Sequence, residues 1–222
     1  MTIDRSKPAF AGIVPPRPSP RISALVLAGV MAIQLGAPPL RAHASEASPA
    51  ATRQPATAKL PKGFTAYGSA PIEGGECIAG NVTEEGLDGR AFVYVKDART
   101  QQPRWVAAIP LRSDWYQNRA THCFAMGGSL FVLVQSDTSQ RSSISQTLLN
   151  VVELSPATGR ILANQDADVP GVDAGYSSWV DKGNEGFHED KGQIKISGQY
   201  FLMNDPNKRI PFTATLPAHA SK

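Results

Sequence analysis

Short apolar segments separated by turn-forming residues dominate the chain from about residue 63 onward. Each holds four to eight residues rich in β-branched and aromatic side chains, which is typical of β-strands. The clearest are residues 91–96, 104–109, 130–135, 148–154, 160–163, 193–197, 200–203 and 210–216. None sustains the 3.6-residue period of an amphipathic helix, and residues 113–121 make a short helix at most. The pattern predicts a mainly β, antiparallel domain with little helix.

Two of these segments differ in the spacing of their apolar residues, and the spacing predicts what covers them. Residues 193–197 alternate between polar and apolar side chains, as expected of a strand with one face in water. Residues 130–134 are apolar throughout, which indicates a strand covered on both faces.

Three hairpins can be drawn from the turns, which suggests a loose repeat. They join residues 92–96 with 104–109, 149–154 with 160–165, and 200–204 with 210–216. A further strand precedes each hairpin, beginning near Cys77, Leu130 and Gln193. Antiparallel repeats of about 40–50 residues are typical of propeller blades, although rings usually need at least four of them. A sandwich or barrel with ordinary hairpins and a propeller-like stack of hairpin units both fit this pattern.

Residues 151–163 (VVELSPATGRILA) resemble the hairpin of quinoprotein-type propeller repeats. The resemblance covers only these residues and ends where such repeats usually carry Trp. It implies a strand–turn–strand unit here and assigns no family to the chain.

The charge and hydropathy of the N-terminal part predict export. Five of the 22 basic residues but only one of the 19 acidic residues lie in the first 44 positions. An apolar run at 22–35 is too short to span a membrane, and the small residues Ala42 and Ala44 suit a signal-peptidase site. We therefore expect a signal peptide at 1–44, a flexible Ala/Pro/Thr-rich tether at 45–62, a single domain at 63–217 and a tail at 218–222. Because the charge that remains is nearly balanced, we expect no nucleic-acid partner, and after cleavage no membrane span.

The chain has two cysteines, Cys77 and Cys123. An even number of cysteines in an exported domain favours a disulfide, and each of these two stands at the start of a strand-like segment. The sequence therefore predicts a Cys77–Cys123 disulfide in a periplasmic or secreted protein.

Catalytic and metal signatures are weak. Only His122, His188 and His219 follow residue 44, and His219 lies in the terminal tail, whereas zinc sites usually need several His or Cys ligands at set spacings. No Gly-x-Ser-x-Gly motif occurs. The acid-rich segment 181–190 does not have the spacing of a calcium loop. We therefore assign no catalytic residue, no metal site and no cofactor.

Aromatic and arginine side chains in loop-like regions give the best indication of a binding surface, because Trp, Tyr and Arg are enriched in interface hot spots. The candidate binding residues are Arg112, Trp115, Tyr116, Arg119, Tyr176 and Trp179. The expected function is an exported, non-catalytic binding protein for a protein partner, either in the cell envelope or an incoming toxin or hydrolase, as an inhibitor or immunity protein would be. The alternatives are a periplasmic hydrolase with an unrecognised site and a propeller-like scaffold or envelope assembly factor.

Overall fold

A computed structural model describes residues 59–84, 87–139 and 145–218. The chain divides into two units, Met1–Ala51 and Thr52–Lys222, and the described residues all belong to the second. The expected signal peptide and most of the expected tether and tail lie outside the described residues.

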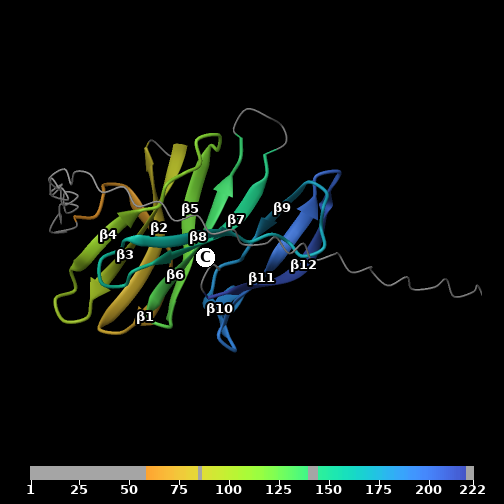
Figure 1. The fold of residues 1–222 in the computed structure, drawn as a ribbon. Helices are drawn as coiled ribbons and strands as arrows, with labels where there is room; N and C mark the ends of the chain where they lie inside the picture. Colours follow the sequence, from red (N-terminus) through yellow and green to blue (C-terminus); the bar gives the residue numbers. More distant parts are fainter. Residues whose placement is uncertain (1–58, 85–86, 140–144, 219–222) are drawn as a thin grey trace, which may run out of the picture. The chain divides into compact units, whose positions relative to one another are not determined.

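Twelve strands of the described residues form three four-stranded antiparallel sheets (Figure 1). The first sheet contains β1 (Phe64–Ile72), β2 (Gly75–Glu84), β3 (Leu87–Asp97) and β4 (Pro103–Ala108). The second contains β5 (Gln117–Met126), β6 (Ser129–Asp137), β7 (Thr147–Leu154) and β8 (Ile161–Asp166). The third contains β9 (Tyr176–Trp179), β10 (Phe187–Asp190), β11 (Gln193–Leu202) and β12 (Asp205–Pro217). The expected mainly β, antiparallel fold class is confirmed, and the architecture is that of an all-β sandwich.

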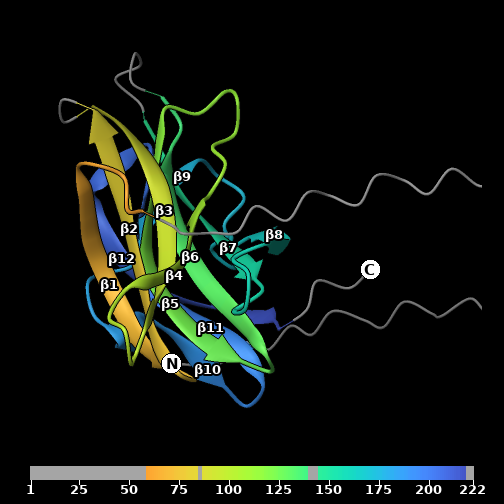
Figure 2. The ribbon, with the colours of Figure 1, turned by 90° about the vertical axis from the view of Figure 1, so that its left-hand side faces the viewer.

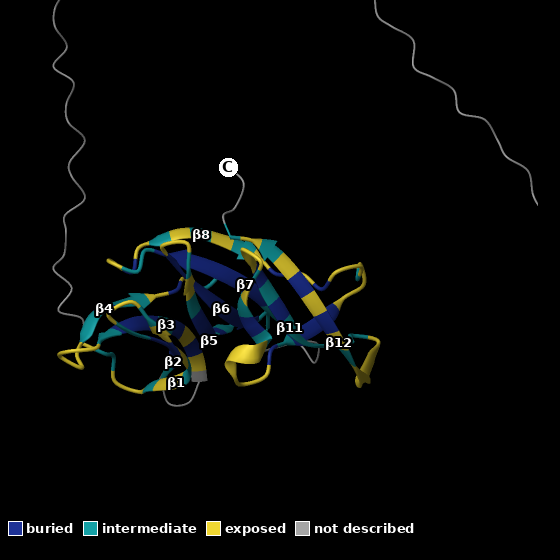
Figure 3. Ribbon diagram, turned by 90° about the horizontal axis from the view of Figure 1, so that it is seen from below, coloured by how far each residue is buried: buried dark blue, intermediate teal, exposed yellow. Residues whose placement is uncertain are grey.

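The second sheet packs against the first on one face and against the third on the other. Along β6 the side chains alternate, so Leu130, Val132 and Val134 join the core shared with the first sheet. Phe131 and Leu133 join the core shared with the third sheet. Figure 3 shows β6 buried along its length, and Figure 2 shows the sheets from the side. The expectation that residues 130–134 are covered on both faces is confirmed.

The third sheet differs from the predicted hairpin pattern. Residues 193–197 and 200–203 do not form two strands, because β11 runs continuously through both as far as Leu202. One edge of β11 pairs with β10 through its first half and with β9 through its second half. These two short strands escaped prediction because polar residues make up half of β9 and most of β10.

The prediction of at most a short helix at residues 113–121 is also wrong. Residues from Gln117 onward form β5, and a turn precedes it. The strand pattern was hidden because Asn118, Thr121 and His122 are polar yet buried. Each of them has a hydrogen-bond partner in the folded chain, as buried polar groups require.

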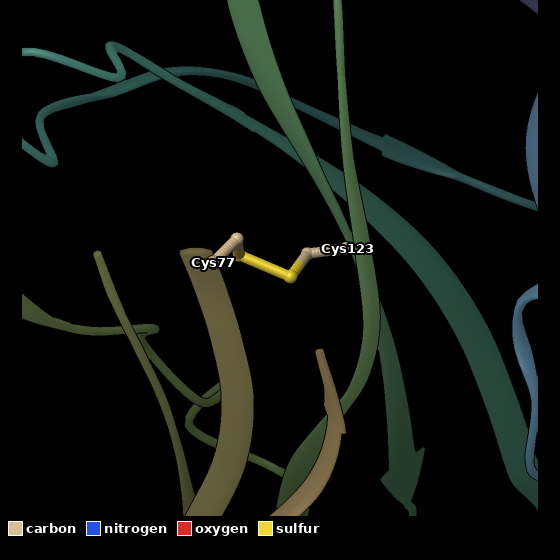
Figure 4. Close-up of a disulfide and its surroundings, with 2 residues drawn as sticks. All are labelled: Cys77 and Cys123. Atoms are coloured by element: carbon tan, nitrogen blue, oxygen red, sulfur yellow. A yellow bond between two sulfur atoms is a disulfide. The ribbon is translucent and has the colours of Figure 1, made fainter. Parts of the chain in front are cut away.

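The predicted disulfide joins Cys77 of β2 to Cys123 of β5 and so links the first two sheets (Figure 4). The two Cα atoms are 6.4 Å apart. Both cysteines are buried in the core between these sheets. The bond therefore fixes the packing of two sheets whose strands are not paired with each other.

Candidate functional site

The candidate binding residues fall into separate places in the fold. Arg112, Trp115 and Tyr116 lie in the segment between β4 and β5. Arg119 and Trp179 line a cavity that the second and third sheets share with β1. Tyr176 lies in β9, where it is only 9% exposed. The structure therefore does not bring the candidates together: they lie along two hollows of the surface and, for Tyr176, in the core.

The segment between β4 and β5 is held to the first sheet by Asn118, which is 2% exposed. The Asn118 side-chain oxygen accepts a hydrogen bond from the Ala91 backbone N–H at 2.7 Å. Its amide nitrogen donates to the Ile109 carbonyl at 3.2 Å. Ile109 in turn donates its N–H to the Ala91 carbonyl at 2.9 Å. The start of the segment is therefore fixed at buried positions.

Arg90 and Asp137 hold the end of the same segment. The Arg90 guanidinium donates to the carbonyls of Asp88, Gly89 and Tyr116 at 3.0–3.1 Å. The Tyr116 N–H donates to the Asp137 carbonyl at 2.9 Å. These bonds fix the backbone of the segment at Tyr116.

A groove of about 840 Å³ runs along this segment. We call it the Trp115 groove. Its apolar lining comes from one end of the first sheet and from the segment itself: Val82, Phe92, Ile109, Leu111 and Trp115. Arg90, Arg112 and Asp88 supply its charged groups. Apolar walls with a few charged groups are typical of recognition sites.

Arg112 places a cation beside the aromatic ring of the groove. Its guanidinium carbon lies 4.5 Å from the centroid of the Trp115 ring, within cation–π range. It also forms an ion pair with Asp166 of β8. The hydrogen bond to this carboxylate raises the pKa of Arg112. Both partners of the ion pair are about half exposed, so the pair positions the side chain more than it stabilises the fold.

The second place is a cavity of about 260 Å³, which we call the Trp179 cavity. Tyr67 of β1, Arg119, Thr121 and His122 of β5, Gln135 of β6, Trp179 of β9 and residues 180–182 line it. Arg119 donates to the Asp137 carboxylate at 3.0 Å. Trp179 also contacts Phe201 and Arg209, whose guanidinium carbon is 5.1 Å from the Trp179 ring centroid.

His122 lies in the wall of this cavity and has no free nitrogen. Its Nε2 is 2.9 Å from the Asp181 carbonyl, which can only accept, so Nε2 carries the hydrogen. Its Nδ1 then accepts from the Thr121 hydroxyl at 2.9 Å. Burial lowers the pKa of His122. Both nitrogens of the neutral ring are hydrogen-bonded, so the ring stabilises the chain around it and is poorly placed to act as a general base.

Tyr176 contributes to the core between the second and third sheets. Its hydroxyl donates to the Asp168 carboxylate at 3.0 Å, and burial raises its pKa. Its ring also packs edge-to-face on Tyr200. The side chain thus stabilises β9 and presents little surface.

Arg90 and Phe92 of the Trp115 groove, and Tyr67 and Lys182 of the Trp179 cavity, were not among the candidates from sequence. Arg90 and Phe92 belong to β3, whose sequence pattern predicts a strand and gives no sign of a binding role. Tyr67 and Lys182 are separated by more than a hundred residues, and no spacing rule connects them.

Within residues 59–84, 87–139 and 145–218, no group of three or more His, Cys, Asp or Glu side chains could hold a metal ion. In the same ranges, no helix is long and apolar enough to cross a membrane. Comparison with known proteins finds no matching family model and no matching curated protein.

Proposed function

We propose that the chain is an exported, non-catalytic binding protein that receives a protein partner in the Trp115 groove. An inhibitor or immunity protein of the cell envelope would work in this way, because such a protein needs only a rigid complementary surface. The buried disulfide supports export, since disulfides persist mainly in oxidising compartments.

One observation carries the proposal: a Trp–Arg pair stands over an apolar groove on a segment that is anchored at both ends. Trp and Arg dominate the energetics of protein interfaces. Anchoring through Asn118 and Arg90 means that little ordering entropy is lost on binding. The surface is therefore preorganised for recognition.

The groove also suggests the chemistry of the partner. Its apolar lining would accept a large apolar side chain, and Arg90 and Arg112 would attract a carboxylate beside it. A segment carrying an apolar residue next to an acidic residue fits this arrangement. A strongly basic segment would meet Arg90 and Arg112 and would find only Asp88 in the lining and Asp166 beside Arg112 to pair with, so it fits less well.

The test is selection from a displayed peptide library against oxidised protein that starts at Ser45. Peptides that bind wild type are then measured against Trp115→Ala, which removes the ring but none of the anchoring bonds. Loss of a central interface Trp costs about 2 kcal/mol or more, which is about 30-fold in affinity. Trp179→Ala is the matched control, because it removes the same side chain from the other site.

Selected peptides that are apolar and acidic, and that lose affinity on Trp115→Ala alone, would support the proposal. Peptides that bind both tryptophan variants as well as wild type would place the binding surface elsewhere. A selection that yields no binder would count against a preorganised protein-binding groove.

A further inference from the structure

The Trp179 cavity has features of a second binding site, on a different surface from the Trp115 groove. Three sheets contribute to it, through β1, β5, β6 and β9. A side chain at Gly68 would bring its Cβ to 2.3 Å from the Thr121 carbonyl, so the glycine allows β1 to approach β5 closely. This approach brings Tyr67 of β1 to the cavity.

Buried hydrogen bonds hold the wall of the cavity. The Gln135 amide nitrogen is 3.1 Å from both the Thr121 hydroxyl and the Val180 carbonyl. His122 binds the Asp181 carbonyl, the next one along the chain. Two buried side chains therefore fix the backbone just after β9, and this backbone carries Lys182 into the cavity lining.

The polar groups without a partner are mainly donors. Among the residues that the structure describes, the Lys182 ammonium, the Tyr67 hydroxyl and the Trp179 indole N–H make no hydrogen bond or ion pair. Arg119 uses one Nη for Asp137 and retains further N–H groups. A ligand that accepts hydrogen bonds would suit these groups, and the two cations favour one with negative charge.

The Asp181 side chain limits how much negative charge a ligand in the cavity could carry. It also lines the cavity, and its carboxylate is 3.4 Å from the Gln199 amide nitrogen. A doubly charged phosphate would be repelled by this carboxylate and by Asp137 behind Arg119. A single carboxylate is the better match for two cations in such surroundings. Trp179 adds a broad apolar surface for a ring.

We propose that the Trp179 cavity binds a small monocarboxylate with one ring, its carboxylate at Arg119 and Lys182 and its ring against Trp179. The cavity volume of about 260 Å³ lies below the roughly 300 Å³ at which pockets for drug-sized ligands begin. An acidic monosaccharide and a hydroxylated aromatic acid both have this chemistry and size.

Titration of ¹⁵N-labelled protein with glucuronate, 4-hydroxybenzoate, glucose and inorganic phosphate distinguishes these ligands. The indole N–H signals of Trp105, Trp115 and Trp179 are assigned with single Trp→Phe variants. One or both acids are expected to shift the Trp179 signal saturably at millimolar concentration and to leave the other two in place. Glucuronate alone would identify an acidic sugar, and 4-hydroxybenzoate alone an aromatic acid.

Lys182→Ala tests the role of charge, because Lys182 is exposed and its loss leaves the fold intact. Loss of one charge-assisted hydrogen bond is expected to weaken acid binding about tenfold. Lys62→Ala removes another exposed lysine and is the matched control. The proposal is overturned if neither acid shifts Trp179, if glucose or phosphate binds as well as the acids, or if Lys182→Ala and Lys62→Ala behave alike.

Discussion

Reduction of the Cys77–Cys123 disulfide should lower the free energy of unfolding by an amount that follows from the length of the loop it closes. The bond spans 46 positions along the chain. Releasing a loop of that length restores unfolded-state entropy worth about 4 kcal/mol in the chain-entropy model. The free energy of unfolding of such domains is about 5–15 kcal/mol, so the reduced protein should stay folded but lose a large part of this free energy.

Urea unfolding followed by tryptophan fluorescence measures this loss. Reduced wild type keeps both sulfur atoms in the core, so it reports the entropy of the loop. The double variant Cys77→Ala/Cys123→Ala also removes two buried sulfurs, and it should lose more stability than reduced wild type does.

Reductant should have no effect on the double variant, which makes the variant a control for other actions of the reductant. The reasoning is refuted if reduced wild type unfolds within about 1 kcal/mol of the oxidised protein. That result would mean that the unfolded chain is already constrained without the bond.

Two further predictions concern the core and pH. Gly159→Ala should destabilise the domain by about 2 kcal/mol or more, because φ is +71° there and a Cβ would lie 2.5 Å from the Trp105 ring. Gly127→Ala is its control, since φ is +59° there but nothing lies within 4 Å of the added carbon, so denaturation midpoints should fall further for Gly159→Ala. Equal falls would contradict a close approach of the Trp105 ring to Gly159. The pKa of His122 is lowered in the folded state, so the unfolded chain takes up the proton first as pH falls below about 6.5. The contribution of His122 to the free energy of unfolding is therefore full above that pH and declines as pH falls toward its lower folded pKa. The charged groups of the cavity that His122 lines are Arg119, Asp181 and Lys182. Urea midpoints measured across this range should fall less in His122→Gln than in wild type, and parallel curves would show that another group causes the decline.

The fold class followed from the sequence because β-strands in a sandwich leave a local signal. Residues 130–134 are apolar at every position, and the structure covers both of their faces. β5 gave no such signal, because buried polar residues such as Asn118 and His122 replace apolar ones there. Their burial is possible only because partners from distant segments satisfy them, and a single sequence does not show those partners.

The candidate residues were harder to predict than the fold. Aromatic side chains in apparent loops can lie in the core or at the surface, and the buried Tyr176 and the half-buried Trp115 illustrate the two outcomes. The groups that complete each site come from other sheets or strands. Arg90 joins Trp115, and Tyr67 joins Trp179, only once the strands are stacked.

The most direct test of the proposed function is affinity capture on the oxidised domain from envelope and secreted fractions of the source organism. Wild type, Trp115→Ala and Trp179→Ala are immobilised in parallel, and bound proteins are identified by mass spectrometry. The account predicts one stoichiometric protein partner that wild type and Trp179→Ala retain and Trp115→Ala loses. A partner retained equally by all three proteins, or no partner on wild type, would contradict it.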